Sequence, residues 1–401
     1  MVPNQKTTAL DSFVDPCAPI CYGILKPGEH VSDGVPVIKV KNIIGGRILE
    51  GDLLRTSPQI HNQYKRAEVN QGDLLLTIRG TTGRVAIVPS SLSGANITQD
   101  TARIRVSSDD DPMYVFYALQ SPSVQRQIDL NTVGQAVKGI NIAEVRKLKI
   151  FHPASDEQKK ISRIMSTWDK AITTTEQLLA NSRQQKKALM QQLLTGKQRL
   201  LDKDGVRFSG EWQFTEIGDF LRESRTRSPT NDPSRRLTVR LNLKGVEVRE
   251  FRGTEALDST AHFVRSAGQF IYGKQNIHKG AFGIIPSSLN GFETSQDLPA
   301  FDFTGKCDSS WFFYYMAQER FFASLEDKMS GTGSKRLNPK VFFKIKINCP
   351  PFKEQQKIAA VLSTADREID TLQRKLDALK QEKKALMQQL LTGKRRVTID
   401  A

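Results

Sequence analysis

KKALMQQLLTGK occurs twice in this chain, at residues 186–197 and again, letter for letter, at residues 383–394. At this offset of 197 residues, 23 of the 41 positions from 157 to 197 are identical between the two copies. Only 18 of the 68 positions from 83 to 150 agree. The chain is therefore a tandem duplication in which one part of each copy has diverged slowly and another part quickly. We expect the slowly diverging segment to have the same role in both copies and the quickly diverging segment to have a different role in each.

The slowly diverging segment, residues 157–195, has the pattern of a long helix with a heptad seam. Its apolar residues recur at alternating spacings of four and three, and a glycine followed by a lysine ends the pattern in each copy. A helix with one apolar stripe needs a complementary stripe, and the nearest one is the other copy. If a pseudo-two-fold axis relates the halves, the two helices form an antiparallel coiled coil. The predicted seam consists of Ile161, Met165, Trp168, Ile172, Leu179, Leu189 and Leu193 in the first copy and Ile358, Leu362, Ile369, Leu372, Leu376, Leu379, Leu386 and Leu390 in the second.

Thr175, Ser182 and the seam lysines weaken the first stripe. Thr175 and Ser182 occupy seam positions where the second copy has Leu372 and Leu379. The sequence therefore leaves open that another subunit covers part of these helices.

Each helix follows a faster-diverging segment with a mixed α/β pattern. In the first, β-rich runs at 35–43, 73–80, 84–89 and 102–106 precede one predicted helix at 113–129 and a closing strand at 147–151. In the second, an aromatic helix is predicted at 311–325 and a closing strand at 344–348. Aromatic residues at helical spacing are more often core than base-stacking platforms, and we interpret these as core.

The predicted architecture is thus a mixed α/β fold with two pseudo-symmetric globular domains separated by two long helices. Its four segments are a first globular domain at 1–153, a central helix at 154–200, a second globular domain at 201–349 and a C-terminal helix at 350–401. A length of 401 residues exceeds one typical core and suits such a division.

The charge of the chain favours a polyanionic partner. The formal net charge is +16 and the pI about 9.6, with the excess spread over all four segments. Nucleic acid is the simplest such partner, and the alternative is a merely basic protein. The first residues carry no apolar signal segment, and no apolar run approaches the roughly 18 residues of a membrane span, so we expect a cytoplasmic protein.

Motifs for catalysis are mostly missing. Neither Gly-Lys pair has the rest of a phosphate-binding Walker loop. Residues 348–352, NCPPF, come within one residue of the [ND]-P-P-[FY] loop of amino-methyltransferases, but Cys349 separates the amide from the prolines, and a strand end followed by a helix start is the favoured interpretation. Cys17, Cys21 and His30 would lack a fourth zinc ligand, so we expect reduced thiols. We predict no catalytic, cofactor-binding or metal-binding residues.

The order of motifs resembles the DNA-specificity subunit of type I restriction-modification systems over nearly the whole chain. The matching motifs are GDLLLTIRGTTG at 72–83, GQAVKGIN at 134–141 with GTGSKRLN at 331–338, the Pro-to-Glu-Gln helix starts and the two LLTGK helix ends. One departure is the W-x(4)-[IL]-G motif, which is present at Trp212–Gly218 but has no clear counterpart before residue 23.

The resemblance implies two target-recognition domains that each read one part of a bipartite, asymmetric site in double-stranded DNA, with the helices setting the distance between them. It also implies two copies of a methyltransferase subunit, which would bring S-adenosylmethionine, and restriction-translocase subunits in the nuclease form. The subunit itself would be non-catalytic. The alternatives are a stand-alone adenine methyltransferase or nuclease with an unrecognised site, and a coiled-coil scaffold that binds DNA without sequence preference.

Reading bases in a groove requires Arg, Lys, Asn and Gln on short loops held by strands. In the first domain we predict DNA contacts from Lys39, Lys41, Asn42, Arg79, Arg84, Gln135 and Lys138. In the second we predict them from Arg240, Asn242, Lys244, Lys274, Asn276, Lys279, Lys335 and Arg336. A solvated surface charge is the alternative for each of them.

Overall fold

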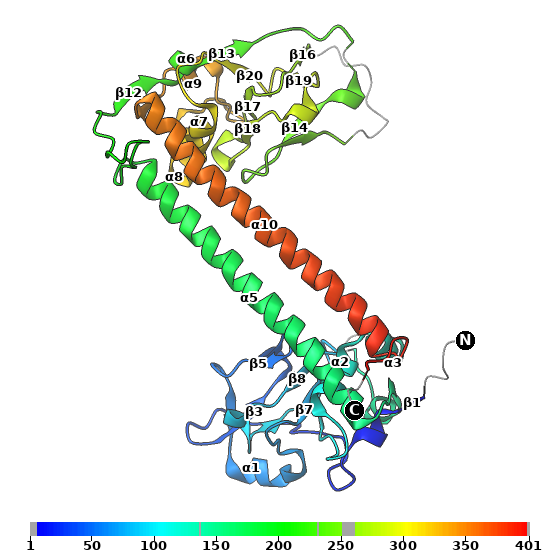
Figure 1. Ribbon diagram of the computed structural model, residues 1–401. Coiled ribbons are helices and arrows are strands. Elements are labelled where there is room, and N and C mark those ends of the chain that lie inside the picture. Colours follow the sequence, from blue (N-terminus) through cyan, green and yellow to red (C-terminus); the bar gives the residue numbers. More distant parts are fainter. Residues whose placement is uncertain (1–5, 136–137, 231, 251–260, 399–401) are drawn as a thin grey trace. The chain divides into compact units, whose positions relative to one another are not determined.

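The computed structural model describes residues 6–135, 138–230, 232–250 and 261–398 (Figure 1). The chain divides into two compact units, which we call unit 1 (residues 1–176 and 374–401) and unit 2 (residues 177–373). Both boundaries fall inside long helices, α5 (Ser155–Leu193) and α10 (Phe352–Leu390). Each unit therefore combines one globular domain with one part of each long helix.

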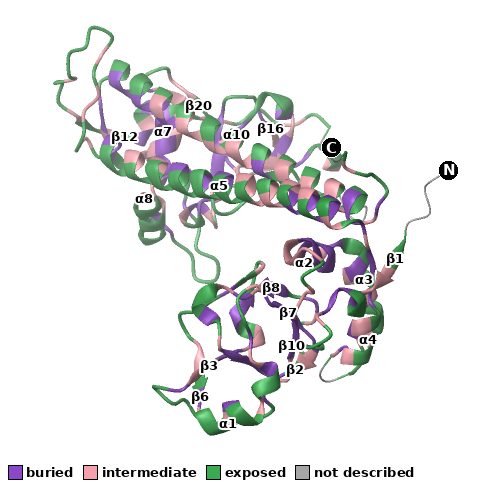
Figure 2. Cartoon of the chain, turned by 60° about the horizontal axis from the view of Figure 1, so that its bottom comes forward, coloured by how far each residue is buried: buried purple, intermediate pink, exposed green. Residues whose placement is uncertain are grey.

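Unit 1 is built on a four-stranded antiparallel sheet in the order β2-β10-β7-β8. Its strands are β2 (Cys21–Tyr22), β7 (Leu74–Thr77), β8 (Val85–Ile87) and β10 (Thr101–Ile104). Successive residues of a strand face opposite sides of its sheet, and Leu74 and Leu76 enter one core cluster while Leu75 enters another. Both faces are thus covered, which explains why every residue of β7 and β10 is buried (Figure 2), the polar Thr77, Thr101 and Arg103 included.

Smaller sheets surround this one. They are β6-β3-β9, with β3 (Val35–Ile38), β6 (Leu54–Thr56) and β9 (Asn96–Ile97), the pair β4 (Ile43–Ile44) and β5 (Arg47–Ile48), and the pair β1 (Thr7–Ala9) and β11 (Lys149–Phe151). The expected single strand at 35–43 is wrong, because a 3-10 turn, η2 (Val40–Asn42), interrupts it. The side chain of Asn42 caps that turn by accepting a hydrogen bond of 3.0 Å from the Lys39 amide.

The helices of unit 1 correct a second expectation. They are α1 (Pro58–Gln63), α2 (Pro112–Gln120), α3 (Pro122–Asn131) and α4 (Ile142–Lys147). The single helix predicted at 113–129 is therefore wrong. Pro122 disfavours helical geometry at Ser121, whose ψ is 147°, and the serine instead caps α3.

Unit 2 repeats the frame, with an antiparallel sheet in the order β13-β20-β17-β18. Its strands are β13 (Leu221–Ser224), β17 (Phe270–Tyr272), β18 (Phe282–Ile284) and β20 (Ala300–Phe303). Around it lie β12 (Gln213–Glu216) with β21 (Lys346–Cys349), β14 (Leu237–Val239) with β15 (Val246–Val248), and β16 (His262–Val264) with β19 (Glu293–Ser295). The short helices are α6 (Ile217–Phe220), α7 (Ser309–Met316), α8 (Glu319–Ser324) and α9 (Pro339–Phe343).

The aromatic segment of unit 2 forms two helices, so the single helix predicted at 311–325 is wrong. Gln318 takes an extended conformation between α7 and α8. The change of direction lets Phe321 pack on Tyr315, with ring centroids 5.1 Å apart. Trp311 and Phe312 are fully buried, which confirms that they belong to the core. Residues 348–352 end β21 and begin α10, as the favoured interpretation of NCPPF predicted.

The predicted antiparallel pairing of the long helices is confirmed inside each unit. In unit 1, Glu176 pairs with Lys380 and Asp169 pairs with Lys383. The residue numbers along α5 therefore fall as those along α10 rise, which is the antiparallel arrangement. Ion pairs and hydrogen bonds in unit 2 follow the same rule, from Ser182 with Glu368 to Lys186 with Asp366. Every predicted seam residue is buried or half-buried.

The ends of the two helices are part of the domain cores. In unit 1, Leu386 and Leu390 of α10 join Ile161 and Met165 of α5 in the same core cluster as strand β7. In unit 2, the matching first-copy residues Leu189 and Leu193 join the core around β17. Each KKALMQQLLTGK segment therefore completes the globular domain encoded by the other copy.

Candidate nucleic-acid interface

A carboxylate in each unit ties one globular domain to both long helices. In unit 1, Asp169 of α5 accepts a hydrogen bond of 2.8 Å from the Tyr117 hydroxyl and pairs with Lys383 of α10. In unit 2, Asp366 accepts 2.7 Å from Tyr314 and pairs with Lys186. These positions are related by the 197-residue offset, so the same fastening orients both domains on their helices.

A second fastening lies where the long helices end. The guanidinium of Arg396 pairs with the buried carboxylate of Glu157 and lies 5.6 Å from the ring centre of Phe151. In unit 2, Arg199 pairs with Glu354 at 2.6 Å and lies 5.8 Å from the ring centre of Trp212. The aromatic partner therefore comes from different places in the two units, from β11 in unit 1 and from the residue before β12 in unit 2, although its role is the same.

The missing W-x(4)-[IL]-G counterpart can now be placed. The Ile217 amide donates to the Ile345 carbonyl at 2.9 Å. Leu148 lies 197 residues before Ile345, and its carbonyl accepts a hydrogen bond of 2.8 Å from the Leu10 amide. Leu10 thus takes the place of Ile217, and β1 takes the place of β12. The position of Trp212 falls on Gln5, which lies outside the described residues.

In unit 1, two of the predicted DNA-binding residues meet at the end of β7. Arg79 forms a backbone bridge to Gly139, and the Gly80 amide donates to the Lys138 carbonyl at 2.9 Å. The Arg79 guanidinium donates to the Gln99 side chain at 3.2 Å, and both Arg79 and Lys138 are exposed. Gln135 is exposed in the same loop, whose residues 136 and 137 lie outside the described residues.

The other predicted residues of unit 1 lie around η2. Lys41 is exposed and pairs with Asp52 at 2.7 Å, Lys39 is half-buried, and Arg84 donates to the Ile43 carbonyl at 3.1 Å. Asn42 is only 4% exposed, and its amide is used within the turn. The structure thus gives Asn42 a capping role. The prediction that Asn42 lies on the exposed surface and contacts DNA is corrected accordingly.

In unit 2, a tight loop brings another group together. The Asn242 amide donates to the Lys279 carbonyl at 2.9 Å, which docks residues 240–245 on the 3-10 turn η6 (Ile277–Lys279). Asn242 itself has a φ of 58°, a left-handed conformation that asparagine tolerates better than most residues. Arg240, Asn242, Lys244 and Lys279 are exposed and Asn276 is half-buried.

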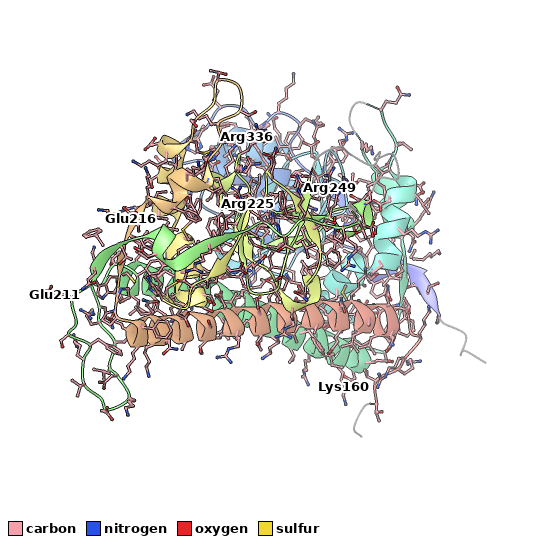
Figure 3. The ribbon with its side chains drawn as sticks, turned by 90° about the horizontal axis from the view of Figure 1, so that it is seen from above. Lys160, Glu211, Glu216, Arg225, Arg249 and Arg336 are labelled. Carbon is pink, nitrogen blue, oxygen red and sulfur yellow. The ribbon has the colours of Figure 1, made fainter. Side chains whose placement is uncertain are left out.

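The remaining predicted residues of unit 2 lie at the end of β17. The Lys274 amide donates to the Asp297 carbonyl at 3.0 Å, and the Arg336 guanidinium lies 3.7 Å from the Asp297 carboxylate. Lys335 lies 3.7 Å from Glu326. Arg336, labelled in Figure 3, is exposed, as Lys335 is, while Lys274 is half-buried.

Several basic residues beside Lys274 were missed from the sequence. Arg225 (Figure 3) and Arg227 line a cavity of about 440 Å³ together with Lys274 and Gln296. The segment Arg222–Arg227, RESRTR, contains three arginines in six residues, and this local density is the signal that could have found them. Their proximity to Lys274 could not be predicted, because it depends on the order of strands in the sheet.

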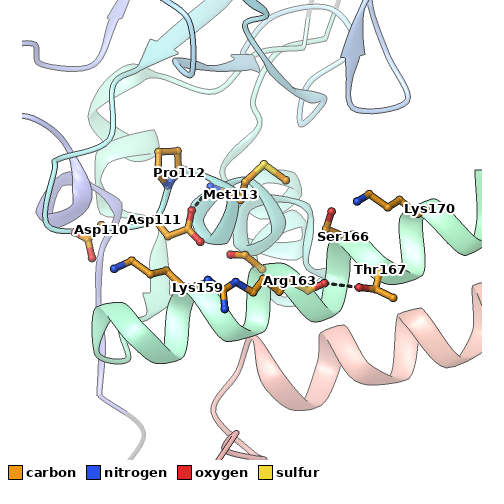
Figure 4. Close-up of a pocket in the computed structure, with 10 residues that line it drawn as sticks. Asp110, Asp111, Pro112, Met113, Lys159, Arg163, Ser166, Thr167 and Lys170 are labelled. Atoms are coloured by element: carbon orange, nitrogen blue, oxygen red, sulfur yellow. Dashed lines mark hydrogen bonds between the residues drawn. The ribbon is translucent and has the colours of Figure 1, made fainter. Parts of the chain in front are cut away.

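Unit 1 has a second kind of surface feature, a groove of about 460 Å³ between the start of α2 and α5 (Figure 4). Lys159, Arg163 and Lys170 line it from α5, and Asp110 and Asp111 line it from the α2 side. The second copy replaces Lys159 with Gln356 and Arg163 with Ala360. Lys170 corresponds to Arg367, so the second copy keeps one of these three basic positions.

Neither thiol chemistry nor a membrane span is indicated in the part of the chain that the structure describes. Burial raises the pKa of the Cys349 thiol to about 11, so this thiol stays protonated at neutral pH. Within the described ranges, no three His, Cys, Asp or Glu side chains are grouped as metal ligands would be. None of the helices in those ranges has the length and apolar character needed to cross a bilayer.

Comparisons with known proteins agree with this geometry. Residues 26–181 and 210–381 match the family described as Type I restriction modification DNA specificity domain. The chain is 32% identical over 157 residues to the Type I restriction enzyme EcoBI specificity subunit of Escherichia coli, a match that covers 39% of this chain and 33% of that protein. The chain thus spans about a third of that relative. It is 22% identical over 350 residues to the MjaVIII specificity subunit of Methanocaldococcus jannaschii, covering 83% of this chain and 81% of that protein.

Solved structures show the same fold at low sequence identity. The HsdS subunit from Thermoanaerobacter tengcongensis has a TM-score of 0.54 and 16% identity, with 98% of both chains covered. The S subunit of a type I restriction-modification system from M. genitalium has a TM-score of 0.57 and 15% identity, with 97% of both chains covered.

Proposed function

This chain belongs to the type I restriction-modification DNA-specificity family, and we propose that it reads a bipartite, asymmetric DNA site, with unit 1 recognising one half and unit 2 the other. As a specificity subunit it recognises DNA, works with methyltransferase and restriction subunits, and is not itself catalytic. Such a role places it with the host DNA, for which we propose the cytoplasm.

The observation that carries the bipartite proposal is a common frame with different basic residues at its edge. The four-stranded sheets of the two units have the same order and pair Ile87 and Ile284, 197 residues apart, with the start of β7 and β17. At the ends of these strands both units have a glutamine at the same position, Gln99 and Gln296. Unit 1 places Arg79 beside it, whereas unit 2 places Lys274, Arg225 and Arg227 nearby. Two unlike half-sites require the same strand frame to carry different hydrogen-bond donors.

A second part of the proposal is that two copies of a methyltransferase subunit dock on the repeated helix ends. Lys187, Ala188 and Gln191 are exposed, and their counterparts Lys384, Ala385 and Gln388 are exposed and identical. Core packing explains identity at buried positions but not at exposed ones. A common surface for two identical partners explains it, and these partners would bring S-adenosylmethionine and the catalytic groups.

The test is a competition experiment with the assembled methyltransferase complex. The complex binds a labelled duplex that contains its site, and unlabelled duplexes with one half-site scrambled compete for it. A specific subunit keeps a ratio of at least about 10³ between specific and scrambled DNA at physiological salt. Equal competition by all duplexes would favour a non-specific scaffold. Methyl transfer by the purified chain alone, given S-adenosylmethionine and DNA, would instead favour a stand-alone methyltransferase.

A further inference from the structure

The cavity of unit 2 lies beside a strand pairing that unit 1 lacks, that of β16 with β19. In unit 1, β9 pairs with β3 in parallel. In unit 2 the corresponding strand β19 keeps one parallel bridge, between Glu293 and Arg236, and pairs in addition with β16 in antiparallel orientation. Residues of β16 and of the turn after β19, Phe263 and Gln296, line the cavity. Its walls are thus built by a segment that unit 1 does not reproduce, on a frame that both units share.

A buried arginine makes the floor of this cavity rigid. Arg265 is 1% exposed and donates to the Thr294 hydroxyl at 2.6 Å, to the Ser224 carbonyl at 2.8 Å and to the Leu298 carbonyl at 3.3 Å. Its guanidinium also lies 5.3 Å from the ring centre of Phe263. Burial lowers its pKa to about 10, which still leaves it charged at neutral pH. These bonds join β13, β19 and the segment after β19, so the walls are held together before any ligand binds.

Hydrogen-bond donors dominate the mouth of the cavity. Arg225 is oriented by a 2.8 Å bond to Glu223, the one carboxylate among the lining residues. Arg227 forms a backbone bridge to Phe263, which fixes where its side chain starts. Within the described ranges, neither Arg227 nor Lys274 has an ion pair. Two cationic groups on fixed backbone therefore remain available to a ligand rich in acceptors.

We propose that this cavity is a base-reading site of unit 2, in which Arg227 recognises a guanine of the second half-site and Lys274 and Gln296 contact the neighbouring base edge. The inference rests on the proposed function and names the residues that carry it out. Guanine presents two adjacent acceptors, O6 and N7, in the major groove, and a guanidinium matches both at once. Arg225, held by Glu223, is placed to contact the adjoining phosphate.

Equilibrium binding of the assembled methyltransferase complex to duplexes randomised in the second half-site tests this proposal. Arg227→Ala should weaken binding to the cognate duplex roughly 5- to 150-fold and remove the preference for guanine at one position. Lys274→Ala should relax the adjacent position, and the first half-site should be read as before. Arg222→Ala is the matched control, because Arg222 is an exposed arginine of the same RESRTR segment that does not line the cavity, and it should change neither preference.

The other outcomes of this binding experiment would overturn the proposal. A uniform loss of affinity for all sequences, with a salt dependence reduced by about one charge, would make Arg227 a phosphate contact and overturn the proposal. An unchanged guanine preference would also overturn it. Arg227→Gln, which keeps most of the side-chain stem, replaces the alanine variant if that variant does not assemble. If the unmodified complex shows no preference in the second half-site, the proposed function itself fails.

Discussion

The hydroxyl of Tyr117 donates a hydrogen bond of 2.8 Å to the carboxylate of Asp169, and the same carboxylate pairs with Lys383. Tyr314, Asp366 and Lys186 repeat the arrangement in unit 2. The two lysines are the first letter of each KKALMQQLLTGK segment. The lysine that begins each repeated segment therefore has a structural role. It takes part in one cluster of contacts that joins a globular domain, the helix that follows it and the other long helix.

Asp169→Asn should lower the stability of unit 1. The substitution leaves Lys383, whose side chain is 17% exposed, without its charged partner. Because the Asp169 side chain is 42% exposed, solvent screening limits the loss to about 1 kcal/mol, or roughly 2–4 °C in Tm. Thermal unfolding followed by circular dichroism measures it. Asp156→Asn is the control, since Asp156 is 75% exposed and lies 3.7 Å from Lys159, and its Tm should not change. Equal Tm values for both variants would show that the contact adds nothing.

Leu376→Asp should disrupt the helix pair in unit 1. Leu376 is 5% exposed in the predicted seam, and burying an unpaired carboxylate there costs about 3–5 kcal/mol. The half-buried Leu379 should give a smaller loss with the same substitution. Leu178→Asp is the control, because Leu178 is 48% exposed and its replacement should cost less than about 0.5 kcal/mol. Denaturant unfolding and complex formation with the methyltransferase are the measurements. Full assembly of the Leu376→Asp variant would refute the seam.

A fragment of residues 1–205 should form a homodimer. Unit 1 needs Leu386, Leu390 and Arg396 from the second copy, and the first copy supplies Leu189, Leu193 and Arg199 at the same spacing. The helix end of each fragment can therefore complete the core of the other fragment, because these residues are identical in the two copies. Sedimentation equilibrium measures the molecular mass. A folded monomer with no tendency to associate would contradict the exchange of helix ends.

Lengthening the helices should lengthen the non-specific spacer of the DNA site. Four residues add about 6 Å of helix, roughly two base pairs. The structure refines where they must be added, because α5 and α10 both pass from one unit to the other. Matched insertions after Ala180 and near Gln373 should add about two base pairs and leave both half-sites unchanged. An insertion in α5 alone should weaken assembly, since α10 then keeps its old length. Sequencing the methylated sites of the host DNA reads out the spacer.

The sequence predicts the repeated parts of this protein far better than the unrepeated ones. The 197-residue offset locates the helices, the seam and the strand frame, because the same packing has to be made twice. It does not locate the break at Gln318, where no proline or glycine marks the end of α7. It also cannot show that Phe151 replaces Trp212 beside the terminal arginine, because Phe151 belongs to β11 and Trp212 directly precedes β12, which are not corresponding elements.

The candidate interface follows the same division. Lys274 and Arg79 could be found from their place in a loop directly after a β-rich run. Arg227 could not be connected with Lys274, because 47 residues separate them and only the sheet order brings both to one cavity. Asn42 shows the opposite error, since an amide on a predicted strand is used by the turn itself.

The most direct test of a two-part recognition function is co-expression of the chain with its methyltransferase, followed by methylation-sensitive sequencing of the host DNA. We expect methylation at one bipartite motif with two unlike half-sites and a spacer of fixed length. Exchanging residues 208–345 for the corresponding segment of another specificity subunit should replace one half-site and keep the other. Methylation at a single continuous motif, or at no motif in particular, would contradict the account.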